Sequence, residues 1–333
     1  MHPETLTAPT AVMPALDLYT PITTDLDEVE RILARVLKSR YAAVNAVVEH
    51  VRHYRGKRLR PVLLLLIARA CGKLTPAHPV LGAVVEMIHT ATLVHDDILD
   101  DATTRRHVAT VNSRWDNKTA VLLGDYLFTH AFHLASTIDA RACQLIGAAT
   151  NRVCEGEMCQ GLNSGNLELT EEEYFDVIDG KTAELIACCC QLGALYSGVS
   201  TDMVQSLTRF GRYVGLAFQI ADDLLDLEGE ERETGKSLGT DLEQQKMTLP
   251  LIRALRHGSA GLIGHLQQLL NEPDRRRRGA LRACLAESDG LDYARRRAEE
   301  FAGKARRELA CLPPSPCRAI LEAIVERVVH RSH

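Results

Sequence analysis

Two clusters of aspartates carry the most distinctive chemistry in this sequence of 333 residues. Each cluster has the pattern DDxxD and ends an apolar run: Asp96, Asp97 and Asp100 form the first, and Asp222, Asp223 and Asp226 form the second. Carboxylates four residues apart share a helix face and repel one another. Hard oxygen ligands of this kind suit Mg²⁺, which keeps waters and binds substrate phosphates through a few carboxylates. We therefore expect two helices to present these clusters across one cavity, with more than one Mg²⁺ ion.

Cationic residues are distributed along the chain so that they can meet a phosphate group. Lys57 and Arg60 precede an apolar segment, and cations at the N-terminus of a buried helix form an anion site. Arg105 and Arg106 follow the first acidic cluster. Lys181 lies in an apolar segment, where an unpaired charge is costly. Metal and cations together predict binding of a diphosphate, and they favour departure of that group with Lewis-acid help.

Each of these features also has a simpler explanation. A single DDxxD is most often an exposed helix end, the basic stretch around Lys57 can be a surface loop, and His89 on an apolar helix is usually a core residue. The arginine run at 275–278 indicates a solvated helix end or loop. The doubled acidic cluster, combined with the separated cations, favours the site.

The composition favours a helical globular protein of the cytoplasm. Hydrophobic residues make up 46% of the chain and aromatic residues only 5%, and the abundant leucine and alanine favour helices over strands. The net charge of −5 argues against a nucleic-acid partner. The ten cysteines contain no CxxC pair and fit reduced cytosolic thiols. No signal peptide is recognised at the N-terminus, and the apolar run at 63–66 is too short to span a bilayer.

Helices must position these residues, because no period-2 strand pattern is found and ten or more helical segments can be recognised. We expect a loose tail over residues 1–24 and a single domain over residues 25–333. The expected helices span 25–40, 41–54, 62–70, 79–101, 117–135, 141–161, 171–199 and 210–227, with one more from about 248 and two after 291. The polar segment 229–245 is expected to be a flexible lid.

In their order, the motifs resemble those of the trans-prenyltransferases, the head-to-tail polyprenyl diphosphate synthases, and most closely the medium- and long-chain octaprenyl type. The resemblance covers roughly residues 25–330. The matching segments are Gly56–Pro61, Glu86–Asp97, Asn117–Lys118, Gly124–Asp125, Lys181–Ala183, Phe218–Asp226, Gly235–Lys236 and Gly239–Leu242. The resemblance implies an all-α fold of antiparallel helices around a deep central cavity, and a homodimer.

The resemblance also assigns roles to the candidate site residues. All six aspartates would bind Mg²⁺ and the allylic diphosphate, and together with Lys181 they would be the catalytic residues. The other substrate-binding residues would be Gly56, then Lys57, Arg60, His89 and Arg106, which would hold isopentenyl diphosphate, and Arg105, Lys181, Thr182, Gln219, Lys236 and Lys246, which would surround the allylic substrate. The chain departs from the family pattern at Arg55 and His107, where glycine is usual, and at Ala109, where proline is common.

The implied reaction is repeated head-to-tail condensation of an allylic prenyl diphosphate with isopentenyl diphosphate. It gives a medium or long all-trans polyprenyl diphosphate, releases pyrophosphate, and yields a product expected to partition to membranes. Two other interpretations stay open: a class I terpene cyclase or head-to-head synthase, and a non-catalytic subunit of a heteromeric synthase. The cations of Gly56–Arg60 favour two diphosphate substrates, and the complete aspartate clusters argue against a non-catalytic subunit.

Product length is expected to depend on side chains along the helix that ends near Asp96. Ala91 and Thr92 stand about one turn before this aspartate, and both are small enough to leave room for a growing tail. Bulky aromatic residues there would stop growth early, so we predict growth beyond the farnesyl stage. Phe128 or Phe132, from the next buried segment, is the expected floor of the tunnel.

Overall fold

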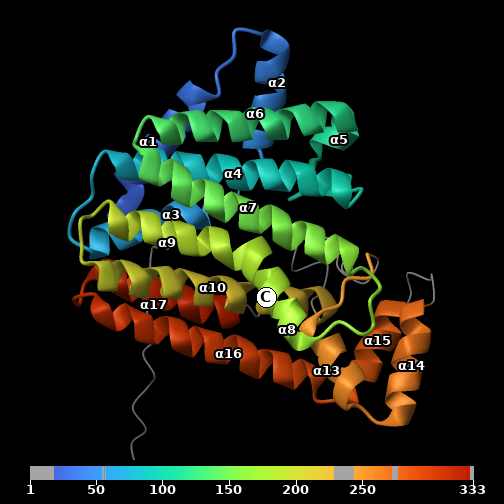
Figure 1. Ribbon diagram of the computed structural model, residues 1–333. Coiled ribbons are helices and arrows are strands. Elements are labelled where there is room, and N and C mark those ends of the chain that lie inside the picture. The colour runs from blue at the N-terminus through green and yellow to red at the C-terminus, as the bar shows by residue number, and fades with distance from the viewer. Residues whose placement is uncertain (1–18, 55, 57, 229–243, 272–276, 331–333) are drawn as a thin grey trace, which may run out of the picture.

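A computed structural model of the chain describes residues 19–54, 56, 58–228, 244–271 and 277–330. Long helices run back and forth through this part of the chain and lie nearly antiparallel in stacked layers (Figure 1). The prediction of an all-α bundle is confirmed. The α-helices are α1 (Thr23–Val36), α2 (Ala42–Arg52), α3 (Leu59–Ala70), α4 (Ala77–Leu99), α5 (Val111–Arg114), α6 (Asn117–Ser136), α7 (Ala140–Leu162), α8 (Glu171–Ile178), α9 (Glu184–Leu195), α10 (Thr201–Glu228), α13 (Leu249–His257), α14 (Ala260–Asn271), α15 (Arg277–Ala286), α16 (Gly290–Glu308) and α17 (Pro316–Val329).

The core is formed where these helices stack on one another. α4 packs against α6 and α3, α3 against α9, α9 against α10, and α10 against α16. Residues 63–67 of α3 are fully buried, as expected for a helix that is apolar almost all round. α4 is long and apolar enough to cross a membrane by composition, but 67% of the relevant window is buried inside the fold. This burial is typical of the core helix of a globular protein.

Side-chain caps begin several of the helices around the site. Asp116 accepts a hydrogen bond from the Thr119 backbone at the start of α6, and Asp139 caps α7 in the same way. Thr170 and Glu173 form a reciprocal capping box at the start of α8. Each cap satisfies backbone N–H groups that have no partner within the helix, so these helix starts are specified locally.

A short β hairpin corrects the prediction that the chain has no strand. β1 (Thr104–Arg105) pairs antiparallel with β2 (Val108–Ala109). The two loop residues, Arg106 and His107, have φ angles of 51° and 64°. Such a loop is usually signalled by Asn-Gly, because both positions are left-handed. The sequence lacks that signal, and the departure at His107 places an ordinary residue where glycine would be unstrained.

The predicted helix over 171–199 is interrupted at the site. α8 and α9 are joined by a π-helical turn, η2 (Asp179–Ala183). Close backbone contacts explain where the turn lies. A Cβ on Gly156 of α7 would be 2.4 Å from the backbone nitrogen of Lys181, and one on Gly215 of α10 would be 2.4 Å from the Ala183 Cα. Two neighbouring helices therefore press on this turn, and π turns are frequent at functional sites.

Some helix boundaries differ from those expected. α3 begins at Leu59 and α10 at Thr201, earlier than predicted. The 3₁₀ helices η1 (Thr20–Ile22) and η3 (Leu309–Cys311) complete the described elements. Ile22 is fully buried, although it falls within the expected tail. Most of the expected lid, residues 229–243, lies outside the described residues.

Candidate active site

The first aspartate cluster lies at the C-terminal end of α4. The Asp97 side chain is only 1% exposed, and its Oδ1 accepts a hydrogen bond from Arg105 Nε at 2.7 Å. Its Oδ2 is buried and has no hydrogen-bond partner. Asp96 and Asp100 are four residues apart and share a helix face. Burial raises the pKa of Asp96 and of Asp97 to about 6, although Lys181 counteracts it at Asp96 and Arg105 at Asp97.

The second cluster repeats this arrangement on α10. Asp223 is 4% exposed. It accepts hydrogen bonds from Gln219 Nε2 at 2.8 Å and from the Tyr174 hydroxyl at 2.7 Å. Asp222 and Asp226 are less buried and share a helix face. In both clusters, therefore, the aspartate at the second position of the DDxxD motif bonds to a neighbouring side chain, and the aspartates at the first and fifth positions are less buried.

The π turn η2 connects the two clusters. Lys181 Nζ contacts Glu157 Oε2 at 2.6 Å and donates to Gln160 Oε1 at 2.8 Å, both on α7. The Thr182 hydroxyl donates to Gln219 Oε1 at 2.7 Å, which extends the network to the second cluster. Lys181 also lowers the pKa of Asp96 against the larger effect of burial, so the amine and the first cluster share one electrostatic environment.

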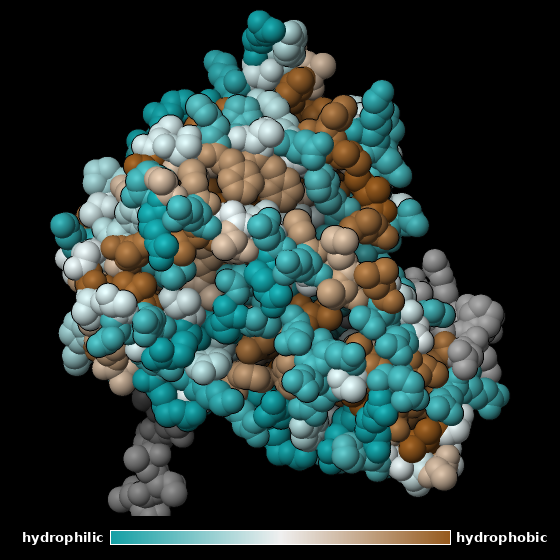
Figure 2. Space-filling view, viewed as in Figure 1, coloured by the Kyte–Doolittle hydropathy of each residue, from teal (hydrophilic) through white to brown (hydrophobic). Residues whose placement is uncertain are grey.

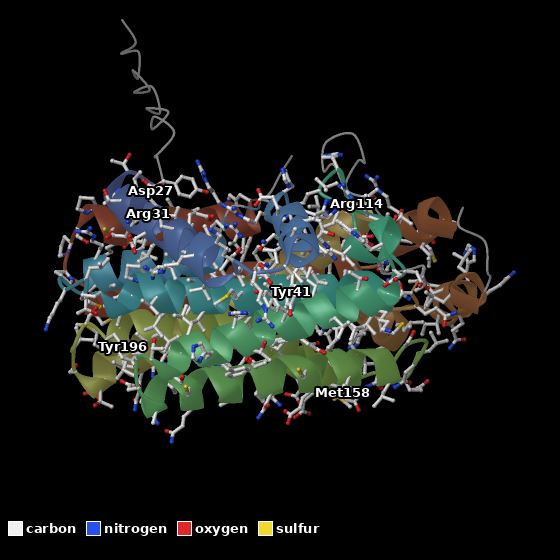
Figure 3. All side chains as sticks on the ribbon, turned by 90° about the horizontal axis from the view of Figure 1, so that it is seen from above. Asp27, Arg31, Tyr41, Arg114, Met158 and Tyr196 are labelled. Atoms are coloured by element: carbon white, nitrogen blue, oxygen red, sulfur yellow. The ribbon has the colours of Figure 1, made fainter. Side chains whose placement is uncertain are left out.

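Sequence reasoning missed Glu157, Gln160 and Tyr174 as site residues. Glu157 follows Gly156, the residue whose backbone lies against the π turn. Met158, next in sequence, points away from the bundle in Figure 3 and is 66% exposed. Polar residues beside an exposed methionine on α7 were the only sequence feature that could have pointed to Glu157. This feature is weak without knowledge of where the π turn lies.

A second group of cations surrounds His89. Burial and the positive charges of Arg60 and Arg106 hold the pKa of His89 well below its ordinary value. Arg60 has a buried Nε without a hydrogen-bond partner. Arg106 NH1 donates to the Tyr54 carbonyl at 2.5 Å and lies over Gly56, where a Cβ would be 2.2 Å away. A neutral histidine near two guanidinium groups, one of which has an unsatisfied Nε, fits an anionic ligand such as a diphosphate.

Other predicted substrate residues are only partly accounted for. Lys246 Nζ lies 3.5 Å from Asp100 Oδ1, which brings a third cation to the first cluster. Arg58, which was not predicted to bind substrate, pairs with Glu30 at 2.9 Å and with Glu86 at 2.6 Å. Lys57, Lys236 and Arg55 lie outside the described residues.

The carboxylates fit Mg²⁺ by donor type, but they do not form a closed metal cage. Within the described ranges, no group of three or more His, Cys, Asp or Glu side chains is placed to hold an ion. Mg²⁺ is normally bound by one or two carboxylates plus waters and substrate phosphates. The pairs on α4 and α10 match that requirement, because each offers two carboxylates on a single helix face.

The predicted chain-length residues lie on α4, which carries Ala91 and Thr92, and on α6, which carries Phe128 and Phe132. Ala91 is fully buried, and the Thr92 hydroxyl bonds to the His89 carbonyl. Phe128 contacts His95 with ring centroids 5.9 Å apart, and a Cβ on Gly124 would be 2.0 Å from His95 Nε2.

Since α4 and α6 run antiparallel, Phe128 lies about one turn and Phe132 about two turns deeper than His95. A cavity of about 40 Å³ nearby is lined by Met87, Thr90, Leu123 and Leu127 among others, and not by the four predicted residues. The tunnel therefore stays a prediction.

Comparisons with known proteins agree with this geometry. The sequence profile of the family described as polyprenyl synthetase matches residues 41–287. Octaprenyl diphosphate synthase of Escherichia coli (strain K12) is 34% identical over 313 residues, which cover 92% of this chain and 96% of that protein. The crystal structure of a decaprenyl diphosphate synthase from Rhodobacter capsulatus superposes with a TM-score of 0.89 at 36% identity, covering 96% of this chain and 99% of the other.

A second solved structure carries ligands. It is a polyprenyl synthase from Caulobacter crescentus CB15 complexed with calcium and isoprenyl diphosphate, with a TM-score of 0.88 and 34% identity over 94% of this chain and 97% of the other. The predicted fold and enzyme class are confirmed by these matches. The chain belongs to the polyprenyl synthetase family and is a polyprenyl diphosphate synthase.

Proposed function

We propose that this chain condenses an allylic prenyl diphosphate with isopentenyl diphosphate in repeated head-to-tail steps, to give a medium or long all-trans polyprenyl diphosphate. The observation that supports the proposal is that two separate groups of side chains could each bind a diphosphate. One lies between the aspartate helices and the π turn, and the other surrounds His89. A condensation of two diphosphates needs both.

The allylic diphosphate is assigned to the first of these sites. Asp96 and Asp100 on α4 would hold Mg²⁺ together with Asp222 and Asp226 on α10, and the bound metal supplies Lewis-acid help to the leaving group. Lys181, Thr182, Gln219, Arg105, Lys246 and Lys236 would complete this site. We revise the predicted role of Asp97 and Asp223, because both are buried and hydrogen-bonded to protein groups. They position Arg105 and Gln219.

Isopentenyl diphosphate is assigned to the site around His89. Arg60 and Arg106 would pair with its oxygens, and Lys57, which lies outside the described residues, is predicted to bind it too. The depressed pKa of His89 keeps the ring neutral, so that it donates a single hydrogen bond without adding charge. The Arg106 guanidinium lies against Gly56, so a side chain at this position would displace it.

The chemistry then follows from the placement of the two substrates. Lys181 and Thr182 stabilise the diphosphate as it leaves the allylic carbon, and the double bond of isopentenyl diphosphate attacks the resulting carbocation-like centre. A proton is lost to the released pyrophosphate, and the product is one isoprene unit longer. The apolar walls of the helices exclude water, which would otherwise capture the cation.

One incubation separates this proposal from its alternatives. The purified chain is mixed with Mg²⁺, farnesyl diphosphate and labelled isopentenyl diphosphate, and the products are separated by chromatography. A ladder of longer labelled prenyl diphosphates is expected, and chelation of the metal should stop it. A cyclised or head-to-head product without incorporated label would indicate the cyclase or head-to-head interpretation. No turnover unless another subunit is added would indicate a non-catalytic subunit.

We also propose a cytoplasmic homodimer whose product passes to membranes. All ten cysteines are free thiols, which fits a reducing compartment. Exposed apolar residues gather where α5 meets the start of α6: Trp115 is 37%, Val121 43% and Leu122 58% exposed. Figure 2 shows apolar surface along that edge of the molecule. Light scattering should give a dimer mass for the wild type and a monomer mass for Leu122→Glu if this face is the interface.

A further inference from the structure

The π turn is bracketed by a single guanidinium group. Arg212 on α10 donates from NH1 to Asp179 Oδ2 and from NH2 to Glu184 Oε2. Asp179 is the first residue of the turn, and Glu184 directly follows its last residue. One side chain of the helix that bears the second aspartate cluster therefore holds both ends of the segment that carries Lys181 and Thr182.

The surroundings show that this bracket is a built feature. All three side chains are partly buried: Arg212 is 33%, Asp179 21% and Glu184 20% exposed. Arg152 of α7 approaches Asp179 from the other side at 4.0 Å. α8, η2 and α9 pass between α7 and α10, so charges from both flanking helices meet at the start of the turn (Figure 1).

The turn needs such support because π geometry is rarely stable alone. It contains one residue more per turn than an α-helix and usually occurs as a single bulge. Relaxation to a regular helix would rotate one flank by about 100°, the angle that each residue adds. That rotation would separate Lys181 from Glu157 and Gln160, or Thr182 from Gln219, which now bond on opposite sides of the turn.

We propose that Arg212 is a positioning residue for the allylic site. It does not touch substrate; it fixes the π turn so that Lys181 and Thr182 reach the departing diphosphate from the correct side. The inference rests on the proposed assignment of the allylic substrate to this turn. Its effect on the reaction should therefore pass through these two side chains and leave the isopentenyl site around His89 untouched.

The first test compares two arginines of the same helix. Arg212→Gln should raise the KM for farnesyl diphosphate about tenfold or more and lower kcat, with an unchanged KM for isopentenyl diphosphate. Arg209→Gln is the matched control, because Arg209 also forms a paired contact, with Glu308 at 2.9 Å, but lies outside the bracket. Equal and small effects of the two substitutions would overturn the proposal.

A double-mutant cycle separates positioning from simple structural support. If Arg212 acts through Lys181 and Thr182, Arg212→Gln should add little to the KM change already caused by replacing both of them, Lys181→Ala with Thr182→Ala. Additive effects would mean that Arg212 acts elsewhere, and would overturn the proposal. The lysine of Arg212→Lys can reach only one of the two carboxylates at a time, so the KM change in this variant should be smaller than in Arg212→Gln.

Two separate controls distinguish a loss of folding from a failure of the proposed function. Thermal unfolding reports whether Arg212→Gln is folded; if it is not, Glu184→Gln removes only one end of the bracket and should show the same KM pattern at smaller size. An unchanged KM for farnesyl diphosphate in that variant would count against the bracket. A wild-type chain that fails to elongate farnesyl diphosphate would instead refute the proposed function, so the two failures are distinguishable.

Discussion

At the residue scale, the aspartate at the second position of each DDxxD motif has a different environment from those at the first and fifth positions. Asp97 and Asp223 are nearly inaccessible and bond to Arg105 and to Gln219 with Tyr174. The spacing i, i+4 places the other two carboxylates of each cluster on one helix face, beside the second aspartate. We therefore propose that the repeated motif combines two functions, ligand presentation by these two carboxylates and side-chain positioning by the second.

This division predicts different kinetic losses within one cluster. Asp96→Asn should lower kcat by at least about a hundredfold at saturating Mg²⁺, because it removes a metal ligand whose effect on charge is worth several kcal/mol. Asp97→Asn should retain much of kcat but raise the KM for the allylic substrate, since Arg105 loses its anchor. Steady-state kinetics of both variants test this, and wild-type kcat in Asp96→Asn would exclude Asp96 as a ligand.

The raised pKa values predict how stability depends on pH. Asp96 and Asp97 have pKa values of about 6 in the folded protein against 3.8 ordinarily. Between these values the folded state binds more protons than the unfolded state, so the free energy of unfolding of the metal-free protein falls as pH rises from about 4 to 6. The stabilising contribution of the two protonated carboxyl groups is fully present below about pH 4 and is lost as the pH rises through about 6.

Asp96→Asn removes the contribution of Asp96 to the pH dependence of the free energy of unfolding. At pH 7 the variant should be more stable than the wild type, by up to about 3 kcal/mol, and near pH 3.5 the difference should vanish. Urea unfolding in the presence of a chelator measures both values. Asp101→Asn, at an exposed carboxylate of the same segment, is the control. A variant that keeps the full wild-type slope between pH 4 and 6 would contradict the prediction.

Neighbouring arginines allow a matched test of the isopentenyl site. Arg60 has an unpartnered Nε, whereas Arg58 is already paired with Glu30 and Glu86. Arg60→Gln should raise the KM for isopentenyl diphosphate about ten- to a hundredfold, since a hydrogen bond to a charged group is worth roughly 1.5–3 kcal/mol. Arg58→Gln should affect stability rather than this KM. A loss in Arg60→Gln confined to the allylic substrate would overturn the assignment.

At the element scale, the helices around the site can be predicted from their local sequence, whereas the π turn and the side-chain contacts around it cannot. The apolar run of α4 and the capping aspartates of α6 and α7 specify these helices. The π turn depends on Gly156 and Gly215 in other helices, and the contacts of Glu157 and Tyr174 depend on tertiary packing. Neither can be found from a periodicity along one segment.

The β hairpin illustrates the same limit and yields a prediction. His107 has a left-handed φ of 64°, which costs an ordinary residue roughly 1–2 kcal/mol. His107→Gly should therefore stabilise the hairpin and raise the midpoint of thermal unfolding, with a smaller gain because glycine also makes the unfolded chain more flexible. Val108→Gly, in the adjacent strand, should destabilise instead. An unchanged or lower midpoint in His107→Gly would show that the ring makes compensating contacts.

At the scale of the whole molecule, both proposed substrate sites include residues of α4. His89 and Asp96 are two turns apart on this helix, so on the proposed assignments the reacting ends of the two substrates would meet near its C-terminal half. We predict that the tail of the growing chain then extends toward the N-terminal half, between α4 and α6, where the side chains of both helices would determine how far it can reach.

Product length should therefore respond to substitutions along this path. Ala91→Phe places a ring at a fully buried position one turn from Asp96 and should shorten the main product to the farnesyl or geranylgeranyl range. Phe132→Ala, about two turns deeper than His95 by the antiparallel packing, should lengthen it, because large-to-small changes in a core leave a void. Thr129→Phe adds the same ring at an exposed position of α6 and should leave the product unchanged. Chromatography of the products from farnesyl diphosphate measures all three. If the wild type stops at the farnesyl stage, or if Ala91→Phe makes the wild-type product, the tail does not pass between α4 and α6, and the cavity lined by Met87 and Leu127 becomes the next path to test.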